Sequence, residues 1–397
     1  MRKTARNPLA LAMSSREAQG GENVANKAYK FRIYPNKAQE QLIQKTFGCV
    51  RFVYNHFLED RITAYKESGE SRTFFQQNKM LTAFKQECEW LKEPDKNALQ
   101  NALRDLNTAY QNFFRRVKNG KNPGFPKFKS KKSDRKSYST ANSHKTDIRT
   151  DGNKIHLPKL GFVKAKISRQ IPDAHRIISA TISQAPSGKY YVSIGTEYEA
   201  EIQNIVLDRG NSLGLDYSSP HFYVGSNGYE ADMPHFYREA ERILAREQRK
   251  LAKMTQGSNN YRKQKIKVAR AYERVRNCRA DWQHKESTRL ANQYDYICVE
   301  DIDYKAMAQG LHLAKATYDN AFGRFRGFLA YKMAERGKKL ITIDKWFPSS
   351  KLCRFCGCVN SELKLGQGEW DCSCGAHLFR DHNAAINIRE EGLRSVG

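Results

Sequence analysis

The sequence predicts an α+β protein of several domains, in which a β-rich module with a helical insert precedes an α/β module. Apolar residues recur at helical spacing through 36–118, whereas short β-like runs separated by turn residues recur through 154–198. From residue 204 onward, apolar strands alternate with long amphipathic helices, as they do in α/β sheets. The chain of 397 residues is long enough for two to four such modules.

The N-terminal part predicts a strand followed by helices. We expect residues 1–25 to form a flexible extension, because the apolar run Leu9–Met13 is too short for the core of a signal peptide. Residues 27–34 alternate polar and apolar side chains, which predicts a strand that a proline closes. Asn36 is then suited to cap a helix. A further helix is expected over 95–117, with an apolar stripe of Leu99, Leu103, Leu106, Tyr110, Phe113 and Val117.

The segment that follows combines basic residues, aromatic residues and helix breakers. Phe125 and Phe128 alternate with lysines, a composition that suits phosphate contact together with base or sugar stacking. A disordered linker is the alternative. The β-like runs of 154–198 then predict a small antiparallel barrel or sheet. The strand at 27–34 could join it, which would make residues 37–118 an insertion.

The second half of the chain predicts strands separated by helices. Its strands are short apolar runs, the pattern of strands that are buried on both faces. Its helices are basic and amphipathic, and Gly337 stands where a glycine would cap the end of one of them. The expected elements are strands at 212–217, 222–224, 296–300 and 340–343, and helices at 234–293 with a break at 256–258, at 322–336 and at 383–391.

The charge of the chain indicates a polyanionic partner. The formal net charge is +27 and it is clustered: segment 115–136 holds ten Lys or Arg residues and one acid, and a second basic stretch runs over 242–279. Nucleic acid is the usual partner of such a chain, although a basic solvated surface is the alternative. No apolar run approaches the roughly 18 residues of a membrane helix, so we expect no membrane partner.

The cysteines indicate a metal site. Five of the nine lie between residues 353 and 374, and no secretory signal accompanies them, which favours a metal over disulfides. Two closely spaced pairs predict a closed, structural Zn²⁺ site with the ligands Cys353, Cys356, Cys372 and Cys374. Because the second pair is CxC rather than CxxC, Cys358 and His377 are candidate substitutes, and free thiols are the alternative. The scattered cysteines are expected to be buried free thiols, namely Cys49, Cys88, Cys278 and Cys298.

Three acidic residues stand out by position. Asp216 lies within an apolar strand, Glu300 ends a second one, and Asp381 begins the final helix. A buried acid is costly unless it is paired or bound to a metal. RNase H-like nucleases bring carboxylates together from strands and a helix in this way, and carboxylate oxygens suit two Mg²⁺ ions that clamp a scissile phosphate. The alternatives are a salt bridge for Asp216, a helix-start acid for Glu300 and a helix N-cap for Asp381.

In this order, these residues resemble the TnpB family of transposon-encoded proteins, which are related to type V CRISPR effectors. The resemblance runs from residue 26 to the C-terminus. Two departures are Ser218, where the family often has glycine, and Phe379, where it commonly has aspartate. The segments that carry the resemblance are GLDYSS at 214–219, ICVEDIDYKAM at 297–307, FPSSKLCRFCG at 347–357, WDCSCG with RDHNAAINI between 370 and 388, NCRADWQHK at 277–285 and PKFKSK at 126–131.

The resemblance implies a wedge-like β-barrel with a helical recognition insert, followed by a split RNase H-like RuvC domain that contains a zinc ribbon. The family's catalytic acids match Asp216, Glu300 and Asp381, and its zinc ligands match the four cysteines named above. The implied boundaries are 26–36 and 119–203 for the barrel, 37–118 for the helical module, 204–346 and 379–397 for the RuvC domain, and 347–378 for the zinc ribbon.

The resemblance also implies an RNA-guided DNA endonuclease. It would bind a guide RNA, transposon-derived or CRISPR-type, and double-stranded DNA beside a short target-adjacent motif, and would hydrolyse DNA with two Mg²⁺ ions. The alternatives are an RNA-guided repressor that does not cut and a transposase or resolvase with the same fold. We expect Arg380 to contact nucleic acid and residues 51–55 and 74–79 to read the motif. We further expect a prokaryotic, cytoplasmic, nucleoid-associated protein, with a monomer favoured.

Overall fold

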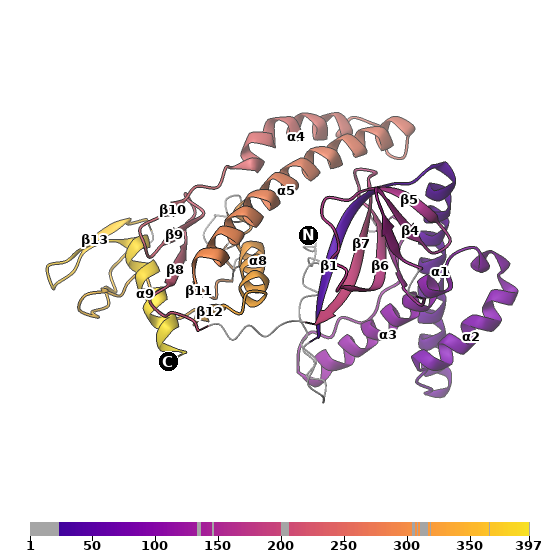
Figure 1. Ribbon diagram of the computed structural model, residues 1–397, viewed down its shortest axis with the longest axis horizontal. Coiled ribbons are helices and arrows are strands. Elements are labelled where there is room, and N and C mark those ends of the chain that lie inside the picture. The colour runs from indigo at the N-terminus through magenta and orange to yellow at the C-terminus, as the bar shows by residue number, and fades with distance from the viewer. Residues whose placement is uncertain are drawn as a thin grey trace. The chain divides into compact units, whose positions relative to one another are not determined.

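The computed structural model describes residues 24–132, 136–144, 147–199, 206–303, 306–307, 309, 317, 319–364 and 366–396. The contacts within the chain divide it into two compact units that meet in the sequence at residue 200. Each unit combines helices with a sheet of its own, so the mixed α+β class predicted from the sequence is confirmed (Figure 1).

The N-terminal unit is built on seven antiparallel strands: β1 Val24–Tyr34, β2 Lys136–Ala141, β3 Arg149–Asp151, β4 Lys154–Leu157, β5 Gly161–Lys166, β6 Arg176–Gln184 and β7 Tyr190–Glu199. Their order is β2-β6-β7-β1-β5-β4-β3. The strand expected at 27–34 does join the later strands, since β1 lies between β7 and β5. Because β2 and β3 stay at the edges, the strands form a curled, open sheet, so the sheet is confirmed of the two predicted forms, barrel or sheet.

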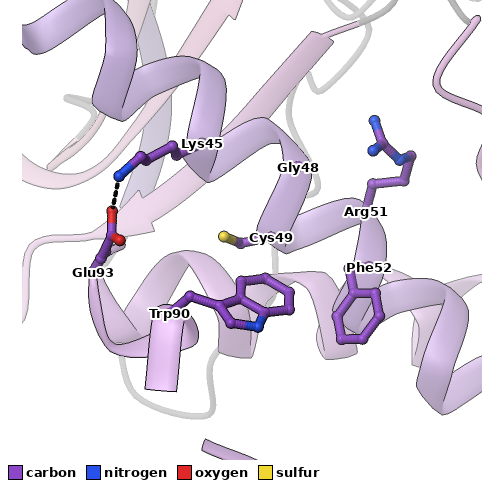
Figure 2. A pocket seen from close by; sticks show the side chains of 7 residues that line it. All are labelled: Lys45, Gly48, Cys49, Arg51, Phe52, Trp90 and Glu93. Carbon is purple, nitrogen blue, oxygen red and sulfur yellow. Dashed lines mark hydrogen bonds and ion pairs between the residues drawn. The ribbon is translucent and has the colours of Figure 1, made fainter. Parts of the chain in front are cut away.

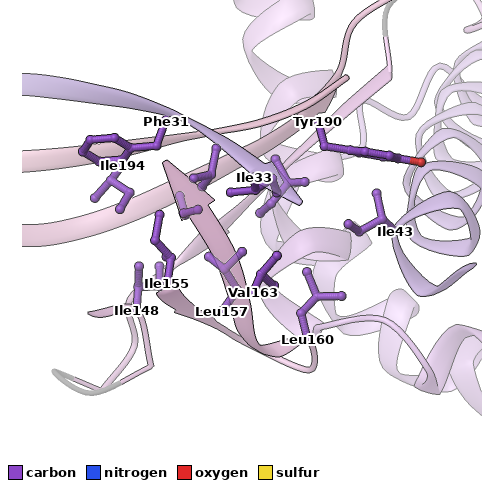
Figure 3. Close-up of a cluster of buried hydrophobic side chains, with 14 of the residues drawn as sticks. Phe31, Ile33, Ile43, Ile148, Ile155, Leu157, Leu160, Val163, Tyr190 and Ile194 are labelled. Carbon is purple, nitrogen blue, oxygen red and sulfur yellow. The ribbon is translucent and has the colours of Figure 1, made fainter. Parts of the chain in front are cut away.

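One face of this sheet buries an apolar core. Tyr29, Phe31 and Ile33 alternate with more exposed residues along β1, as the two-residue period of a strand requires. Ile43 from the following helix packs into the same cluster, so that helix lies against the sheet (Figure 3). The core therefore joins β1, which precedes the helical insert, to the strands that follow it.

The helical insert consists of α1 Lys37–Ser68, α2 Phe74–Glu87, a 3-10 turn η2 Glu89–Lys92 and α3 Lys96–Lys118. The predicted cap of α1 is confirmed: Asn36 and Gln39 accept hydrogen bonds from each other's backbone N–H groups. The stripe expected on α3 is buried only in its first half. Its last residue, Val117, is 52% exposed, because the helical core ends near Tyr110.

The C-terminal unit contains a mixed sheet of five strands: β8 Ser212–Tyr217, β9 Tyr223–Gly225, β10 Glu230–Ala231, β11 Tyr296–Glu300 and β12 Lys339–Ile343. The order is β10-β9-β8-β11-β12, in which β8, β11 and β12 are parallel and the other two strands are antiparallel. All four strands expected in this region are therefore present. A separate hairpin pairs β13 Glu369–Asp371 with β14 His377–Phe379.

The helices of this unit are α4 Phe236–Ala252, α5 Asn259–Gln293, α8 Phe322–Ala334 and α9 Arg380–Arg394. They cover both faces of the sheet. Phe325 and Leu329 of α8 pack with Leu215 of β8 on one face, whereas Ile388 of α9 packs with Cys298 of β11 on the other. The break expected between the basic helices is confirmed, because α4 ends and α5 begins on either side of it.

Two further expectations have a definite outcome. Cys49 and Cys298 are buried and Cys88 is half-buried, but Cys278 is exposed, so the expectation of a buried thiol is wrong there. Cys278 lies on a stretch of α5 that faces solvent, since Arg276 is exposed as well. Among the residues that the structure describes, no helix has both the length and the apolar character needed to cross a membrane.

Candidate active site and metal centre

Two of the three predicted acids are neighbours on the central strands of the C-terminal sheet. β8 and β11 run parallel with Leu215 opposite Val299, so the next residues, Asp216 and Glu300, follow side by side on the face that α9 covers. Both carboxylates are half-buried and lie toward the carboxyl ends of their strands. Ligand sites of open α/β sheets form at this edge.

The third acid comes from α9. Asp381 is half-buried in the first turn of that helix, and the residue at the N-cap is Phe379, so the alternative of a capping role for Asp381 is wrong. The helix approaches β8 very closely at Gly214, where an added Cβ would lie 2.0 Å from the carbonyl oxygen of Ala385. Only glycine permits this approach, which brings Asp381 within electrostatic reach of Asp216.

The electrostatics of the three acids favour a bound cation. Burial raises the pKa of Asp216 well above its usual value, and the charges of Glu300 and Asp381 raise it further, while Arg380 lowers it. Burial also raises the pKa of Glu300, which a hydrogen bond from Ser349 partly offsets. Asp216 makes no salt bridge to any residue in the described parts of the chain. Oxygen ligands that repel one another in this way suit a divalent cation.

Polar residues that the sequence analysis did not single out hold this arrangement. The Ser349 hydroxyl donates to Glu300, and the backbone oxygen of Ser349 accepts from Asn387 of α9 at 2.8 Å. Asn383 and Asn387 both donate to the backbone oxygen of Leu352 at 2.7 Å. Asparagine is a poor helix former, so two asparagines within the buried face of α9 were the available signal.

The four predicted zinc cysteines converge. Their Sγ atoms all lie within 4.8 Å of one another, and no other group of three or more His, Cys, Asp or Glu side chains in the described residues is placed to hold one metal ion. Gly357 and Gly375 follow the two knuckles with positive φ angles of 76° and 89°, which lets the backbone turn tightly. The Cys374 backbone N–H lowers the pKa of the Cys372 thiol to about 6, whereas hydrogen bonds with Cys372 raise the pKa of Cys356 and Cys374.

The alternative ligands lie outside this group. Cys358 is exposed, and its backbone oxygen accepts a hydrogen bond from the Cys353 N–H at 2.8 Å. His377 is engaged elsewhere, because its Nδ1 lies 2.7 Å from Asp371 and its Nε2 lies 3.5 Å from Glu369. The donor set of four thiols is the chemistry of a structural zinc site, since no position is left for water.

The N-terminal unit contains two hollows beside the residues expected to read DNA. One, of about 350 Å³, is lined by Arg51, Phe52 and Trp90, with Lys45 paired to Glu93 at 2.7 Å across its rim (Figure 2). The other, of about 750 Å³, is lined by Arg51 together with Phe128, Lys129, Lys131 and Lys136. Exposed aromatics among basic side chains are suited to contact nucleic acid.

Asn55, on α1 beside these hollows, binds the backbone of the basic segment at Lys129. Its side-chain amide donates to the backbone oxygen of Lys129 at 3.0 Å and accepts from the backbone N–H of Lys129 at 2.7 Å. The ammonium group of Lys129 lies 3.9 Å from the ring centre of Tyr54. Both side chains therefore fix the basic segment to α1. Phe75, in the other stretch expected to read the motif, is 76% exposed at the start of α2.

Three family models match the chain: a helix-turn-helix domain over 25–70, a "Probable transposase" over 193–310 and a Cas12f1-like TNB domain over 322–388. Over the first range the structure contains β1 and the single long helix α1.

A "Putative RNA-guided DNA endonuclease" of Streptomyces pristinaespiralis is 34% identical, covering 92% of this chain and 89% of that protein. The "Putative RNA-guided DNA endonuclease InsQ" of Escherichia coli K12 is 29% identical, covering 92% of each.

The fold has a counterpart among solved structures. The Cas12f1 chain of a cryo-EM structure, determined with sgRNA and target DNA, superimposes with a TM-score of 0.52 at 11% identity, covering 93% of this chain and 99% of that one. At such low identity the likeness concerns the fold alone. Taken together, these matches define the class, an OrfB-type protein of transposons. Within it, the chain belongs to the TnpB family, which confirms the resemblance seen in its motifs.

Proposed function

We propose that this protein is an RNA-guided DNA endonuclease whose RuvC-like site consists of Asp216, Glu300 and Asp381. The observation that carries the proposal is the meeting of three half-buried carboxylates, from two parallel strands and one helix, without a salt bridge to Asp216 in the described residues. A fold without a catalytic use for these acids would gain stability by replacing them. The names and fold of its relatives support the same function.

Each residue has a defined part in hydrolysis. Asp216, Glu300 and Asp381 would hold Mg²⁺, which supplies charge stabilisation of the phosphodiester and a more acidic water. The oxygen atoms of the three acids are less tightly gathered than the sulfur atoms of the cysteine group, and two Mg²⁺ ions are the proposed occupants. Ser349 keeps the Glu300 carboxylate in one orientation through its hydrogen bond. Arg380, whose charge lowers the pKa of Asp216, would contact the scissile strand.

The cysteine cluster would hold Zn²⁺ as a structural ion. Besides the thiols, its apolar core consists of few side chains, chiefly Leu363, Trp370 and Leu378. So small a core is insufficient to fix a segment of this length, whereas a tetrahedral metal site is sufficient. The ribbon, at 347–378, contains Ser349 and ends shortly before Asp381, so the metal would also maintain the geometry of the carboxylate site.

The basic and aromatic hollows of the N-terminal unit would bind the guide RNA and the duplex beside the target. Arg51 lines both hollows, so it is our choice for contact with the target-adjacent motif. A guide RNA would read the rest of the target by base pairing. The proposed place of action is the prokaryotic nucleoid, where the target DNA lies.

The proposal is tested by a plasmid-cleavage assay with Mg²⁺. The protein is co-expressed with its flanking locus, so that it acquires its guide RNA, and is assayed with and without RNase treatment. Cleavage of a matched plasmid that RNase abolishes is the expected result. A complex that binds the target without cutting it would indicate a repressor, and cleavage that is insensitive to RNase would indicate a guide-free resolvase.

A transposase is the second candidate, because one family model that matches residues 193–310 is described in that way. The same carboxylates could join strands as well as hydrolyse them, since related sites on this fold do both. Incubation with transposon-end DNA and a target plasmid separates the two functions. Strand-transfer products would favour the transposase, and linearised plasmid alone would favour the endonuclease.

A further inference from the structure

Three arginines from two helices come together on the face of the C-terminal sheet opposite α9. Arg276 and Arg279 lie one turn apart on α5, and Arg324 lies in the first turn of α8. The Arg324 Nε donates to Gln283 at 2.9 Å, and the Arg279 Nη1 donates to the backbone oxygen of Asp319 at 2.9 Å. Burial, with repulsion from Arg279 and Arg276, lowers the pKa of Arg324 to about 10.

The charge of Arg324 has no acidic counterpart in the described residues. Arg276 has Glu273 at 4.0 Å. Burial lowers the pKa of Arg279, and the charge of Asp319 partly offsets this effect. No carboxylate in the described residues forms an ion pair with Arg324. Its Nη2 atom is buried without a hydrogen-bond partner. The neighbouring segment 304–318 contains no aspartate or glutamate in its sequence. A desolvated guanidinium of this kind is costly unless an anion from another molecule completes it.

The start of α8 adds to the positive potential. No acidic side chain lies in its first turn, and no side chain caps it. The residue at the N-cap is Ala321, in the left-handed conformation with φ of 48°. Uncapped N–H groups at a helix start attract anions, and they support the arginines without being the site themselves.

The arginines lie close to the strand that carries a proposed catalytic acid. Tyr217 directly follows Asp216 on β8, and its hydroxyl accepts from Asn320 at 3.3 Å. Its ring meets that of Phe322 in α8, with centroids 5.3 Å apart. Because adjacent strand residues point to opposite faces, the arginines flank the same strand end from the other side of the sheet. A nucleic-acid strand that crosses the sheet edge at the end of β8 would reach both the three arginines and the carboxylates.

We propose that Arg276, Arg279 and Arg324 together bind one phosphodiester group of the DNA strand that is cut. The planar guanidinium suits phosphate because it donates two parallel hydrogen bonds. The inference rests on the proposed function, since proximity to the carboxylates is what favours the cleaved DNA over the guide RNA. The arginines would act as positioning residues, holding the strand while the carboxylates carry out the chemistry.

The test measures binding rather than cutting. The protein–guide RNA complex, with Asp216→Ala in every sample to prevent cleavage, is titrated with labelled single-stranded target DNA between about 50 and 200 mM KCl. Arg324→Ala is expected to weaken binding by about tenfold and to reduce the slope of log affinity against log salt by about 0.7. Arg276→Ala, at an exposed position, is expected to reduce the slope as well. The affinity of the Arg324→Lys complex is expected to lie between those of the Arg324→Ala complex and the parent complex.

The control is Arg394→Ala, which removes an exposed arginine at the end of α9, outside the basic stretch 242–279, and should leave the salt slope unchanged. Unfolding temperatures show whether each variant is folded. If Arg324→Ala does not fold, the salt slope of Arg276→Ala carries the test. Unchanged slopes for both variants would overturn the site. Less co-purified guide RNA, together with an unchanged DNA salt slope for the complexes that still hold RNA, would overturn the assignment of the arginines to DNA. Both readouts are independent of cleavage, so failure of the nuclease proposal would be seen separately.

Discussion

Asp216 lies half-buried on β8 beside two further carboxylates, and this placement has a thermodynamic consequence. Its folded pKa is raised above the usual value of 3.8, so the folded state holds the proton more firmly than the unfolded state. Stability therefore falls as pH rises from the unfolded pKa toward the folded one. This contribution is lost as pH rises through the folded pKa of Asp216, unless a cation compensates the charge.

Asp216→Asn should therefore abolish cleavage and, in a chelating buffer at neutral pH, raise the unfolding temperature by a few degrees. The amide removes the charge that burial disfavours while keeping the shape of the side chain. Thermal unfolding with chelator and with Mg²⁺ tests this, and Mg²⁺ should stabilise the parent protein more than the variant. A variant that is less stable than the parent in chelator would show that Asp216 has a stabilising partner.

Lys332 provides a second prediction at the residue scale. Its ammonium group is buried on α8 and donates to the backbone oxygen of His284 and to the hydroxyls of Ser287 and Thr288, at 2.6, 2.7 and 2.7 Å. Burial, with a smaller effect of Arg336, lowers its pKa to about 8 from 10.5. Because the unfolded state binds this proton more firmly, the contribution of Lys332 to stability rises as pH rises between these values.

Urea unfolding of the parent protein and of Lys332→Met at about pH 8 and about pH 10 measures this contribution. The free energy of unfolding of the parent, relative to that of the variant, should increase across the interval. Other titrating groups are common to both proteins and cancel in the difference. A difference that does not change with pH would mean that Lys332 keeps an ordinary pKa in the folded state.

At the scale of elements, the position of α9 depends on two close contacts with the sheet. One is at Gly214 of β8, and the other is at Gly392 of α9, where a Cβ would lie 2.5 Å from the sulfur of Cys298. Since α9 carries Asp381 and the asparagines that hold the Ser349 segment, a shift of this helix would disturb the site and the ribbon together. Gly392→Ala should thus lower both stability, by about 1–3 kcal/mol, and cleavage.

Gly327→Ala is the matched control. Gly327 lies within α8, and nothing lies within 4 Å of an added Cβ. Alanine there should stabilise the protein by about 0.5–1 kcal/mol, because glycine is a poor helix former. Denaturant unfolding of both variants compares them directly. Equal effects of the two substitutions would show that the close contact of α9 with β11 does not limit stability.

The elements that the sequence predicted best are those with a strong local pattern. The apolar runs of β8, β11 and β12 and the capped start of α1 were predicted, because hydrophobicity and capping are local properties. The exposure of Cys278 was missed, since composition does not show which side of a long helix faces solvent. The choice between a barrel and an open sheet could not be made from the sequence, because strand order depends on pairing between distant segments.

The candidate site likewise has residues that the sequence predicted and contacts that it did not. Its acids and cysteines were visible because their types and spacing are unusual for their surroundings. The hydrogen bond from Ser349 to Glu300 joins residues 49 positions apart, and the arginine cluster depends on how α8 packs on α5. Such contacts arise from tertiary packing, so no local pattern in the sequence could indicate them.

At the scale of the whole molecule, the two units have separate cores, and the cysteine cluster that is the proposed zinc site belongs to one of them. Removal of zinc with a strong chelator should therefore expose backbone amides of residues 347–379 and the start of α9, while the amides of the N-terminal unit stay protected. Hydrogen exchange resolved by segment measures this. If chelation increased amide hydrogen exchange equally in both units, or in neither, a structural zinc site confined to the ribbon would be contradicted.

The most direct test of the central claim compares four variants of the RNA-loaded protein on a matched plasmid with Mg²⁺. Asp216→Ala, Glu300→Ala and Asp381→Ala should each reduce cleavage by at least about a thousandfold while target binding is retained. Glu390→Ala, which removes an exposed acid from the same helix as Asp381, should cleave normally. If any of the three carboxylate variants cleaved at the rate of Glu390→Ala, that residue would not belong to the site proposed here.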